Sequence, residues 1–366
     1  MHTTAFLEPR FAIRQPLGRG EGTQVFLAED TWQQSELVVV KILVRSSADH
    51  LAAMRKEFLH ARQLRHPGLS RVRHLGTWDS QGRLCLVSDY VDGQALDSWS
   101  QKRSPEELAA PLAYTARTLA FMHATGVLHG DVKPAHILVA EDGVRTSLVD
   151  LGLASTQSDR ATAVAGTPGY LAPEVIRAAG ADEASDVFAL GATALTCVSG
   201  ELPDLRMVAT AEPAEWTAHV AELLDKLSCP WLELHLKRAL AFDPVARPSA
   251  LELADAFSKA ADYPLDPIAP LALRLVGRDS ELELLEAMLD DLDCGRTTGP
   301  GIVVIDGPPG AGKSRLVDEL ATLVELSGGI VLGGERQGGA DPVESLATQL
   351  TSLDAMSADQ GPEGDG

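Results

Sequence analysis

The sequence predicts an α+β fold of two lobes, a small β-rich one and a larger helical one, followed by an incomplete α/β segment. Three observations lead to this prediction. Alternating and β-branched segments dominate residues 11–90. Long apolar runs with helical spacing follow, the clearest starting at Ser185. Near the C-terminal end, an apolar run, a glycine-rich loop and a helical pattern follow one another, which is the order of a β-loop-α unit.

Composition limits the classes of function that the chain can have. Its 366 residues suffice for two or three domains, and the net charge of −21 argues against binding to nucleic acid or to an acidic membrane. Apolar runs stay shorter than the ~18 residues of a membrane span, and the N-terminus lacks the layout of a signal peptide. The four cysteines are far apart, which favours reduced thiols and predicts a cytoplasmic location.

The first candidate site is a glycine-rich hairpin. Gly18, Gly20 and Gly22 lie between the apolar residues Leu17 and Val25. Glycines without a Cβ let backbone amides close over phosphate groups. The alternative is an ordinary flexible hairpin, and the pattern alone favours that alternative.

A lysine in the next predicted strand strengthens the phosphate interpretation. Lys41 is the one charge in the β-branched run from Leu37 to Val44. Residues 48–64 then have helical spacing, and Glu57 on this helix is placed to reach Lys41. The alternatives are a lysine that extends to solvent at a sheet edge and a solvated glutamate.

Two further strands are predicted at residues 71–78 and 83–90, and the second leads into a turn. Such a connection can serve as a hinge between two lobes, and we expect Ser88 and Asp89 to face an adenine ring there. A helix starting at Pro105 is expected to stop near Pro111, followed by a longer helix.

The central loop, HGDVKPAHILV from His129, holds the candidate catalytic groups. Asp131 can accept a proton from an attacking hydroxyl, and Lys133 can neutralise charge on a transferring phosphoryl group. Asp150 ends the next predicted strand, where a second carboxylate can hold Mg²⁺. Either of these acids is, by itself, equally compatible with a solvated turn.

The rest of the helical lobe contains a loop and two notable charges. Residues 154–166 lack an apolar period and predict a mobile surface loop. Asp186, at the start of the long apolar helix, is either an N-cap or an anchor for a loop backbone. Arg247 lies in a proline-bounded turn before the last helix of this region.

Taken together, these motifs resemble the eukaryotic-like Ser/Thr protein kinases of bacteria, over residues 11–258. The resemblance implies a bilobal protein-kinase fold, with an N-lobe at about 11–90 and a C-lobe at about 94–258. It implies that Glu57 pairs with Lys41, that Asp131 is the catalytic base and that Asp150 binds metal. The matching residues are Gly18, Gly20, Lys41, Glu57, Asp131, Lys133, Asp150, Glu174, Asp186 and Arg247, with Glu174 and Arg247 resembling a buried ion pair.

Thr23 stands where the family has its third glycine, and two further departures from the pattern bear on the chemistry. Gly130 replaces the arginine before the catalytic aspartate, as in kinases that need no activation-loop phosphate. His136 replaces the metal-binding asparagine, and imidazole is a poor ligand for Mg²⁺. His136 is therefore either a second metal ligand, which would favour Mn²⁺, or a spacer beside a single ion held by Asp150.

The C-terminal region carries a second nucleotide motif. A predicted strand at residues 301–306, a G-x-x-x-x-G-K-S loop and a helix form a P-loop. Its phosphate cradle comprises Gly307, Gly310, Gly312, Lys313 and Ser314. The region resembles the start of an AAA-type or STAND-type ATPase, but after a further strand at 329–333 we find no acidic strand end. This pattern predicts a fragment or a truncated product.

The predicted organisation is a kinase domain at 11–258, a linker at 259–275, a partial P-loop domain at 276–350 and a disordered tail at 351–366. The expected reaction is ATP-dependent phosphorylation of protein Ser/Thr hydroxyls, with ATP and Mg²⁺ or Mn²⁺ as cofactors. The alternative is a pseudokinase, a nucleotide-binding scaffold with little phosphotransfer. Expected partners are protein substrates, and the C-terminal region is a candidate site for regulatory partners.

Overall fold

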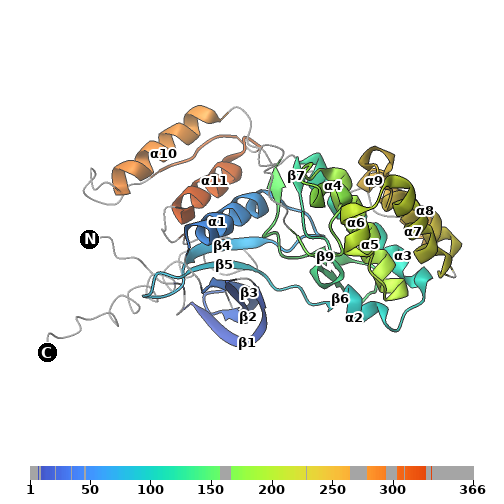
Figure 1. Cartoon of the computed structure of the whole chain (residues 1–366). Helices are drawn as coiled ribbons and strands as arrows, with labels where there is room; N and C mark the ends of the chain where they lie inside the picture. Colours follow the sequence, from blue (N-terminus) through green and yellow to red (C-terminus); the bar gives the residue numbers. More distant parts are fainter. Residues whose placement is uncertain are drawn as a thin grey trace. The chain divides into compact units, whose positions relative to one another are not determined.

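The computed structural model describes residues 7, 10–20, 22–33, 35–44, 47–156, 166–227, 229–263, 278–293, 303–308, 310–326 and 331. They divide into two compact units. The first unit comprises Met1–Leu59, Val72–Tyr90 and Arg274–Gly366, and the second comprises His60–Arg71 and Val91–Leu273. Figure 1 shows the elements of both units, coloured along the chain.

An antiparallel sheet forms the centre of the first unit. Its strand order is β1-β2-β3-β5-β4, so β1 and β4 are the edge strands. Every second residue of β3 is buried, at Val38, Val40 and Ile42, and these side chains join Phe11 and Trp78 in one apolar core. The strands predicted from residue 37 to residue 90 are confirmed to within one residue at each end. The bounds are β1 Phe11–Gly20, β2 Thr23–Asp30, β3 Glu36–Leu43, β4 Val72–Thr77 and β5 Leu84–Asp89.

Helix α1 (Ala48–Gln63) follows β3 and confirms the predicted helix at 48–64. It buries Met54, Phe58 and Ala61, which recur at helical spacing along one face. The last turn of this helix, from His60, is part of the second compact unit.

The described C-terminal elements belong to the first unit. Helix α11 (Lys313–Leu326), orange-red in Figure 1, packs against β4 and against α10 (Asp279–Asp293). The prediction of a strand at 301–306 is wrong for residues 303–306, because residues 303–308 form neither helix nor strand. A strand needs a neighbour for its backbone groups; no such pairing is formed by 303–308, and Val304 is 81% exposed. The strand predicted at 329–333 lies outside the described residues except for Val331.

The second unit is mainly helical, as predicted. Helix α5 (Glu183–Ser199) is buried on all sides from Ser185 to Leu195 and packs against α3 (Ala109–Ala124), α8 (Pro230–Ala239) and α9 (Ala250–Ala260) (Figure 1). Phe188 and Leu190 are fully buried. The helices are α2 Leu96–Ser100, α3 Ala109–Ala124, α4 Pro173–Ile176, α5 Glu183–Ser199, α6 Leu205–Thr210, α7 Pro213–Asp225, α8 Pro230–Ala239 and α9 Ala250–Ala260.

Short strands and 3₁₀ turns complete this unit. β6 (Gln94–Ala95), β8 (Ile137–Val139) and β9 (Thr146–Leu148) form one small sheet, while β7 (Val127–Leu128) pairs with β10 (Ser155–Thr156). The 3₁₀ turns are Pro105–Leu108, Pro134–His136 and Pro244–Ala246. Most of the predicted surface loop at 154–166, and residues 264–275 of the predicted linker, lie outside the described residues.

The predicted helix end near Pro111 is wrong. A 3₁₀ turn from Pro105 leads directly into α3, which starts at Ala109 and contains Pro111 in its first turn. Proline is tolerated there because the first four backbone N–H groups of a helix have no intrahelical acceptor. The two predicted helices are therefore one 3₁₀ turn and one α-helix.

Across the parts of the chain that the structure describes, no helix has the length and apolar content needed to cross a membrane.

Candidate active site

The Lys41–Glu57 pair forms as predicted. Lys41 Nζ donates to Glu57 Oε1 at 3.1 Å and to Oε2 at 3.0 Å. Alternation along β3 directs Val40 and Ile42 into the apolar core, so Lys41 lies on the opposite face of the sheet. Only 7% of the Glu57 side chain is exposed. A half-buried ammonium held in this way keeps a fixed position, which suits it to binding an anion.

The glycine-rich hairpin also forms. β1 and β2 are antiparallel, with Gly18 opposite Val25 and Gly20 opposite Thr23. Gly22 has φ +75°, a left-handed conformation that glycine adopts without strain. Leu17, before the first glycine, is 46% exposed. The hairpin thus supplies exposed backbone at its tip, while its phosphate-binding role remains a prediction.

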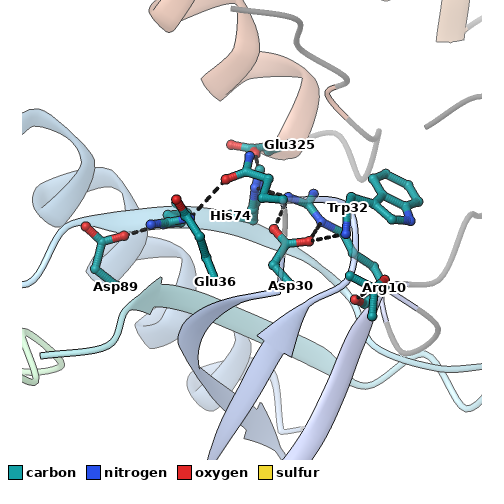
Figure 2. A network of polar contacts seen from close by, with 10 residues as sticks. Arg10, Asp30, Trp32, Glu36, His74, Asp89 and Glu325 are labelled. Atoms are coloured by element: carbon teal, nitrogen blue, oxygen red, sulfur yellow. Dashed lines mark hydrogen bonds and ion pairs between the residues drawn. The ribbon is translucent and has the colours of Figure 1, made fainter. Parts of the chain in front are cut away.

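Ser88 and Asp89 lie at the end of β5. Ser88 pairs with Val39 of β3, and the Asp89 carboxylate accepts a hydrogen bond from Arg73 (Figure 2). Arg73 also donates to Glu36 at 2.7 Å. The side chain of Asp89 is therefore engaged in a surface ion-pair cluster, and the adenine contacts of both residues remain predictions.

In the second unit, Asp131 is held by two neighbours. Lys133 Nζ donates to Asp131 Oδ2 at 2.7 Å, and Thr167 donates to Oδ1 through its backbone N–H at 2.8 Å and its hydroxyl at 2.7 Å. Burial by itself raises the pKa of the Asp131 carboxyl, but the hydrogen bonds from Lys133 and Thr167 outweigh it and lower the pKa below the usual value. Asp131 is therefore an ionised, oriented acceptor.

Asp186 anchors the backbone of the loop that carries Asp131. Its carboxylate accepts from the backbone N–H groups of His129 at 2.8 Å and Gly130 at 2.9 Å, and from His123 Nε2 at 2.9 Å. The N-cap of α5 is Asp182. Of the two roles left open for Asp186, the loop anchor is therefore the correct one. Burial raises its pKa, but these donors lower it overall.

His136 lies between Asp131 and Asp150. Its Nδ1 is 3.0 Å from the backbone oxygen of Asp131, and its Nε2 is 3.7 Å from Asp150 Oδ2. Because a carbonyl oxygen only accepts, Nδ1 carries the proton and Nε2 presents its lone pair toward Asp150. Burial lowers the pKa of His136, which keeps the imidazole neutral. A lone pair and a carboxylate oxygen thus face each other, an arrangement that a divalent cation would stabilise.

The P-loop residues lie at the start of α11. Gly307, Gly310 and Gly312 all have positive φ, and Lys313 Nζ donates to the carbonyl oxygen of Gly307 at 2.6 Å. Arg278, just before α10, donates to the carbonyl oxygen of Ala311 at 3.0 Å. Lys313 and Ser314 open a helix of 14 residues, whose N-terminal backbone amides favour phosphate binding.

Comparison with known proteins agrees with this geometry. Residues 11–256 match the family model of the protein kinase domain, which is more than half of the chain. The chain belongs to the protein kinase family. Residues 274–363, which include the P-loop, match the model of an AAA ATPase domain.

Similar proteins include a probable serine/threonine-protein kinase of Dictyostelium discoideum, 30% identical over 66% of this chain. The serine/threonine-protein kinases pkn2 of Myxococcus xanthus and PknB of Mycobacterium tuberculosis are 30% and 31% identical over 54% and 56% of this chain. The matches cover 50%, 25% and 34% of the three proteins. The chain thus spans half or less of the length of these relatives.

Gly130 fits the backbone of the kinase domain for a steric reason. Its φ is +78°, and a Cβ at this position would lie 2.7 Å from the backbone oxygen of Leu153. Any side chain here, including the arginine common in the family, would require Leu153 or the loop to move. The glycine is therefore matched to the way this loop packs.

Glu174 and Arg247 form the predicted buried ion pair of the kinase domain. Arg247 Nη1 and Nη2 donate to the two Glu174 oxygens at 2.6 and 2.8 Å. Arg247 also donates to the backbone oxygens of Ala241 and Ala184, and Ser185 donates to Glu174. Arg247, in the turn before α9, thus makes a bidentate pair with Glu174 of α4 and a further hydrogen bond to the start of α5. These contacts hold the three segments together.

Sequence reasoning missed Thr167, which donates twice to Asp131. Thr167 lies 36 positions away along the chain, and a threonine between Gly166 and Pro168 has no periodicity that marks it. The signal available was the turn chemistry of the Gly-Thr-Pro-Gly sequence itself, which fixes a backbone N–H in position to donate.

Proposed function

We propose that this chain transfers the terminal phosphoryl group of ATP to serine and threonine hydroxyls of proteins. The observation that carries the proposal is the Asp131 carboxylate, oriented and ionised by Lys133 and Thr167. Lys133 and Pro134 are the residues expected in Ser/Thr kinases at these positions, and the similar proteins bear the names of such kinases.

In the proposed reaction each residue has a distinct role. Asp131 orients the substrate hydroxyl and accepts its proton as the oxygen attacks the terminal phosphorus of ATP, and ADP departs. Lys133 and Lys41 stabilise the phosphate charge, and Glu57 holds Lys41 in place. The hairpin glycines cover the phosphates, with the base contacted by Leu17, Val25, Ser88 and Asp89.

Kinase and AAA ATPase domains use ATP with a divalent metal, and we propose Mg²⁺ or Mn²⁺ for this chain. Asp150 and His136 would hold the ion, which neutralises phosphate charge when bound. Among the described residues no three acidic, histidine or cysteine side chains converge on one point. Phosphate oxygens and waters would supply the other ligands, as in other Mg²⁺–nucleotide sites.

We further propose the domain bounds 11–258 for the kinase and 276–350 for the P-loop domain, with a linker at 259–275 and a tail at 351–366. The proposed location is the cytoplasm, and the proposed partners are protein substrates and regulatory proteins that bind the C-terminal region. Lys313 and Ser314 are proposed to bind a second nucleotide.

The role of His136 leads to a test of metal preference. His136→Asn replaces a nitrogen ligand with an amide oxygen, which Mg²⁺ prefers. We expect the ratio of Mn²⁺-supported to Mg²⁺-supported activity to fall about tenfold, equal to about 1.4 kcal/mol. Electron paramagnetic resonance titration should show weaker Mn²⁺ binding in the variant.

His235→Asn changes a half-buried histidine of α8 that has no role in the proposed reaction; it is the control and should change neither quantity. A fall in Mg²⁺-supported activity in His136→Asn would contradict the ligand role and indicate that His136 serves another purpose.

The proposed function is tested with radiolabelled ATP, the full chain and a generic protein substrate, followed by phosphoamino-acid analysis. We expect label in phosphoserine or phosphothreonine, and undiminished label in the Lys313→Ala variant, because the P-loop is a separate nucleotide site. Nucleotide binding without any labelled protein would instead establish a binding scaffold without phosphotransfer.

A further inference from the structure

A buried carboxylate on the P-loop helix contacts the sheet of the kinase domain. Glu325 lies in the last turn of α11, its side chain is 3% exposed, and its Oε1 is 2.8 Å from His74 Nδ1 on β4. Figure 2 shows Glu325 and His74 pointing toward each other. Neither the kinase chemistry nor the P-loop motif explains why a carboxylate is buried at this end of the helix.

The hydrogen-bond partners of His74 fix its protonation. His74 Nε2 is 3.0 Å from Arg10 Nη2, and a guanidinium only donates. Nε2 must therefore accept, and the ring proton lies on Nδ1, where it is donated to Glu325. Burial, together with the nearby Arg10 charge, lowers the pKa of His74, although Glu325 and Asp30 oppose this effect. His74 is thus neutral, in one tautomer.

The same network closes the base of the glycine-rich hairpin. Arg10 immediately precedes β1 and donates to both oxygens of Asp30, the last residue of β2, at 2.9 and 2.6 Å. Phe11 and Asp30 are paired across the hairpin. The side chains of Arg10 and Asp30 are 4% and 0% exposed. Glu325, His74, Arg10 and Asp30 therefore form a continuous chain of polar contacts, in which only the His74 side chain, at 18%, is more than slightly exposed (Figure 2).

The position of β4 in the sheet gives its contact with α11 a structural role. β4 is an edge strand of the described sheet, and exposed edges invite unwanted pairing unless another element covers them. α11 packs against this strand. The P-loop residues Lys313 and Ser314 begin the same helix that ends near Glu325, so one rigid element carries both the phosphate cradle and the contact to His74.

We propose that the edge strand β4 is a docking surface for the chain's own P-loop helix, with Glu325 accepting the hydrogen bond that His74 donates from Nδ1–H. Through Arg10 and Asp30 the docked helix stabilises the base of the glycine-rich hairpin. The C-terminal segment is thereby an intramolecular partner of the kinase N-lobe. The contact is independent of the proposed phosphotransfer, so its test needs no activity measurement.

The test is hydrogen exchange, followed by mass spectrometry, on the full chain. In Glu325→Gln an uncharged amide replaces the carboxylate. The hydrogen bond from His74 Nδ1–H then has a neutral acceptor and is weaker. We expect amide protection in α11 and β4 to fall at least about tenfold, which corresponds to ~1.4 kcal/mol of local opening. Glu319→Gln is the matched control, because Glu319 pairs with Arg315 within α11. Equal protection in the two variants would overturn the proposal.

A second arm of the test measures how the contact between Glu325 and His74 depends on the protonation of His74. Arg10, Asp30 and Glu325 are the charged groups that face the ring. Because the folded-state pKa is lowered, the contribution of neutral His74 is fully present above the ordinary pKa of about 6.5 and is lost as pH falls through the folded value. Because the Glu325 carboxylate itself raises the pKa of His74, it opposes this loss, and we expect the difference in protection between the native chain and Glu325→Gln to grow from pH 7.5 to pH 5. A difference that stays constant would refute a direct contact between Glu325 and the His74 ring.

Discussion

Replacing Asp131 with asparagine is expected to lower the kcat of phosphotransfer by about 10²–10⁴-fold, the usual contribution of a positioned general base. Asparagine has nearly the same shape and keeps one oxygen to accept from Lys133 or Thr167. It cannot accept the proton of a substrate hydroxyl at neutral pH. The loss should therefore appear in kcat, measured with saturating ATP, while the Kd for nucleotide changes little.

Asp142→Asn is the matched control, since Asp142 is an exposed turn residue paired with Arg145. It should leave kcat unchanged. Transfer at the native rate by Asp131→Asn would show that Asp131 is not the base, and would assign any phosphotransfer to another group.

Replacing Arg247 with alanine should produce the largest loss of stability. Its side chain is fully buried, so the substitution leaves the Glu174 carboxylate charged and without its bidentate partner. Breaking a buried ion pair from one side costs about 3–5 kcal/mol. Urea unfolding of the full chain, followed by circular dichroism, should show this decrease in the transition that melts the helical unit.

Arg238→Ala removes an exposed arginine from α8 and should change the free energy of unfolding by less than about 0.5 kcal/mol. The double variant Glu174→Met and Arg247→Met should recover part of the loss, because neither charge then remains buried alone. If Arg247→Ala resembled Arg238→Ala, the pair would have no structural role.

The elements that could be predicted from the sequence are those whose apolar residues recur with a clear period. Lys41 interrupts a β-branched strand, and Glu57 lies beside the apolar stripe of a helix, so both faces could be assigned before the contact was known. The predictions that were wrong depended on features outside the local pattern, namely where a helix begins and whether a partner strand is present. Pro111 ends a helix only when it lies beyond the first turn, and residues 303–306 form a strand only if a neighbouring strand pairs with them.

Contacts between distant residues could not be predicted from periodicity. The choice between capping and anchoring for Asp186 depended on whether the loop at His129 and Gly130 came within reach, 56 positions away. Glu325 and His74 are separated by 251 positions. On the sequence, Glu325 is one acid among 52 acidic residues, and only the packing of α11 on β4 distinguishes it.

The hydrogen bonds of Asp131 restrict the direction from which a substrate can approach. An ionised carboxylate offers about four lone-pair positions. Thr167 occupies both positions on Oδ1, and Lys133 occupies one on Oδ2. Within the described structure, the remaining position on Oδ2, beside His136 Nδ1 at 3.4 Å, is left for an incoming hydroxyl. The carboxylate therefore acts as a single-entry acceptor, and a serine or threonine presented from any other side would first have to displace Thr167 or Lys133.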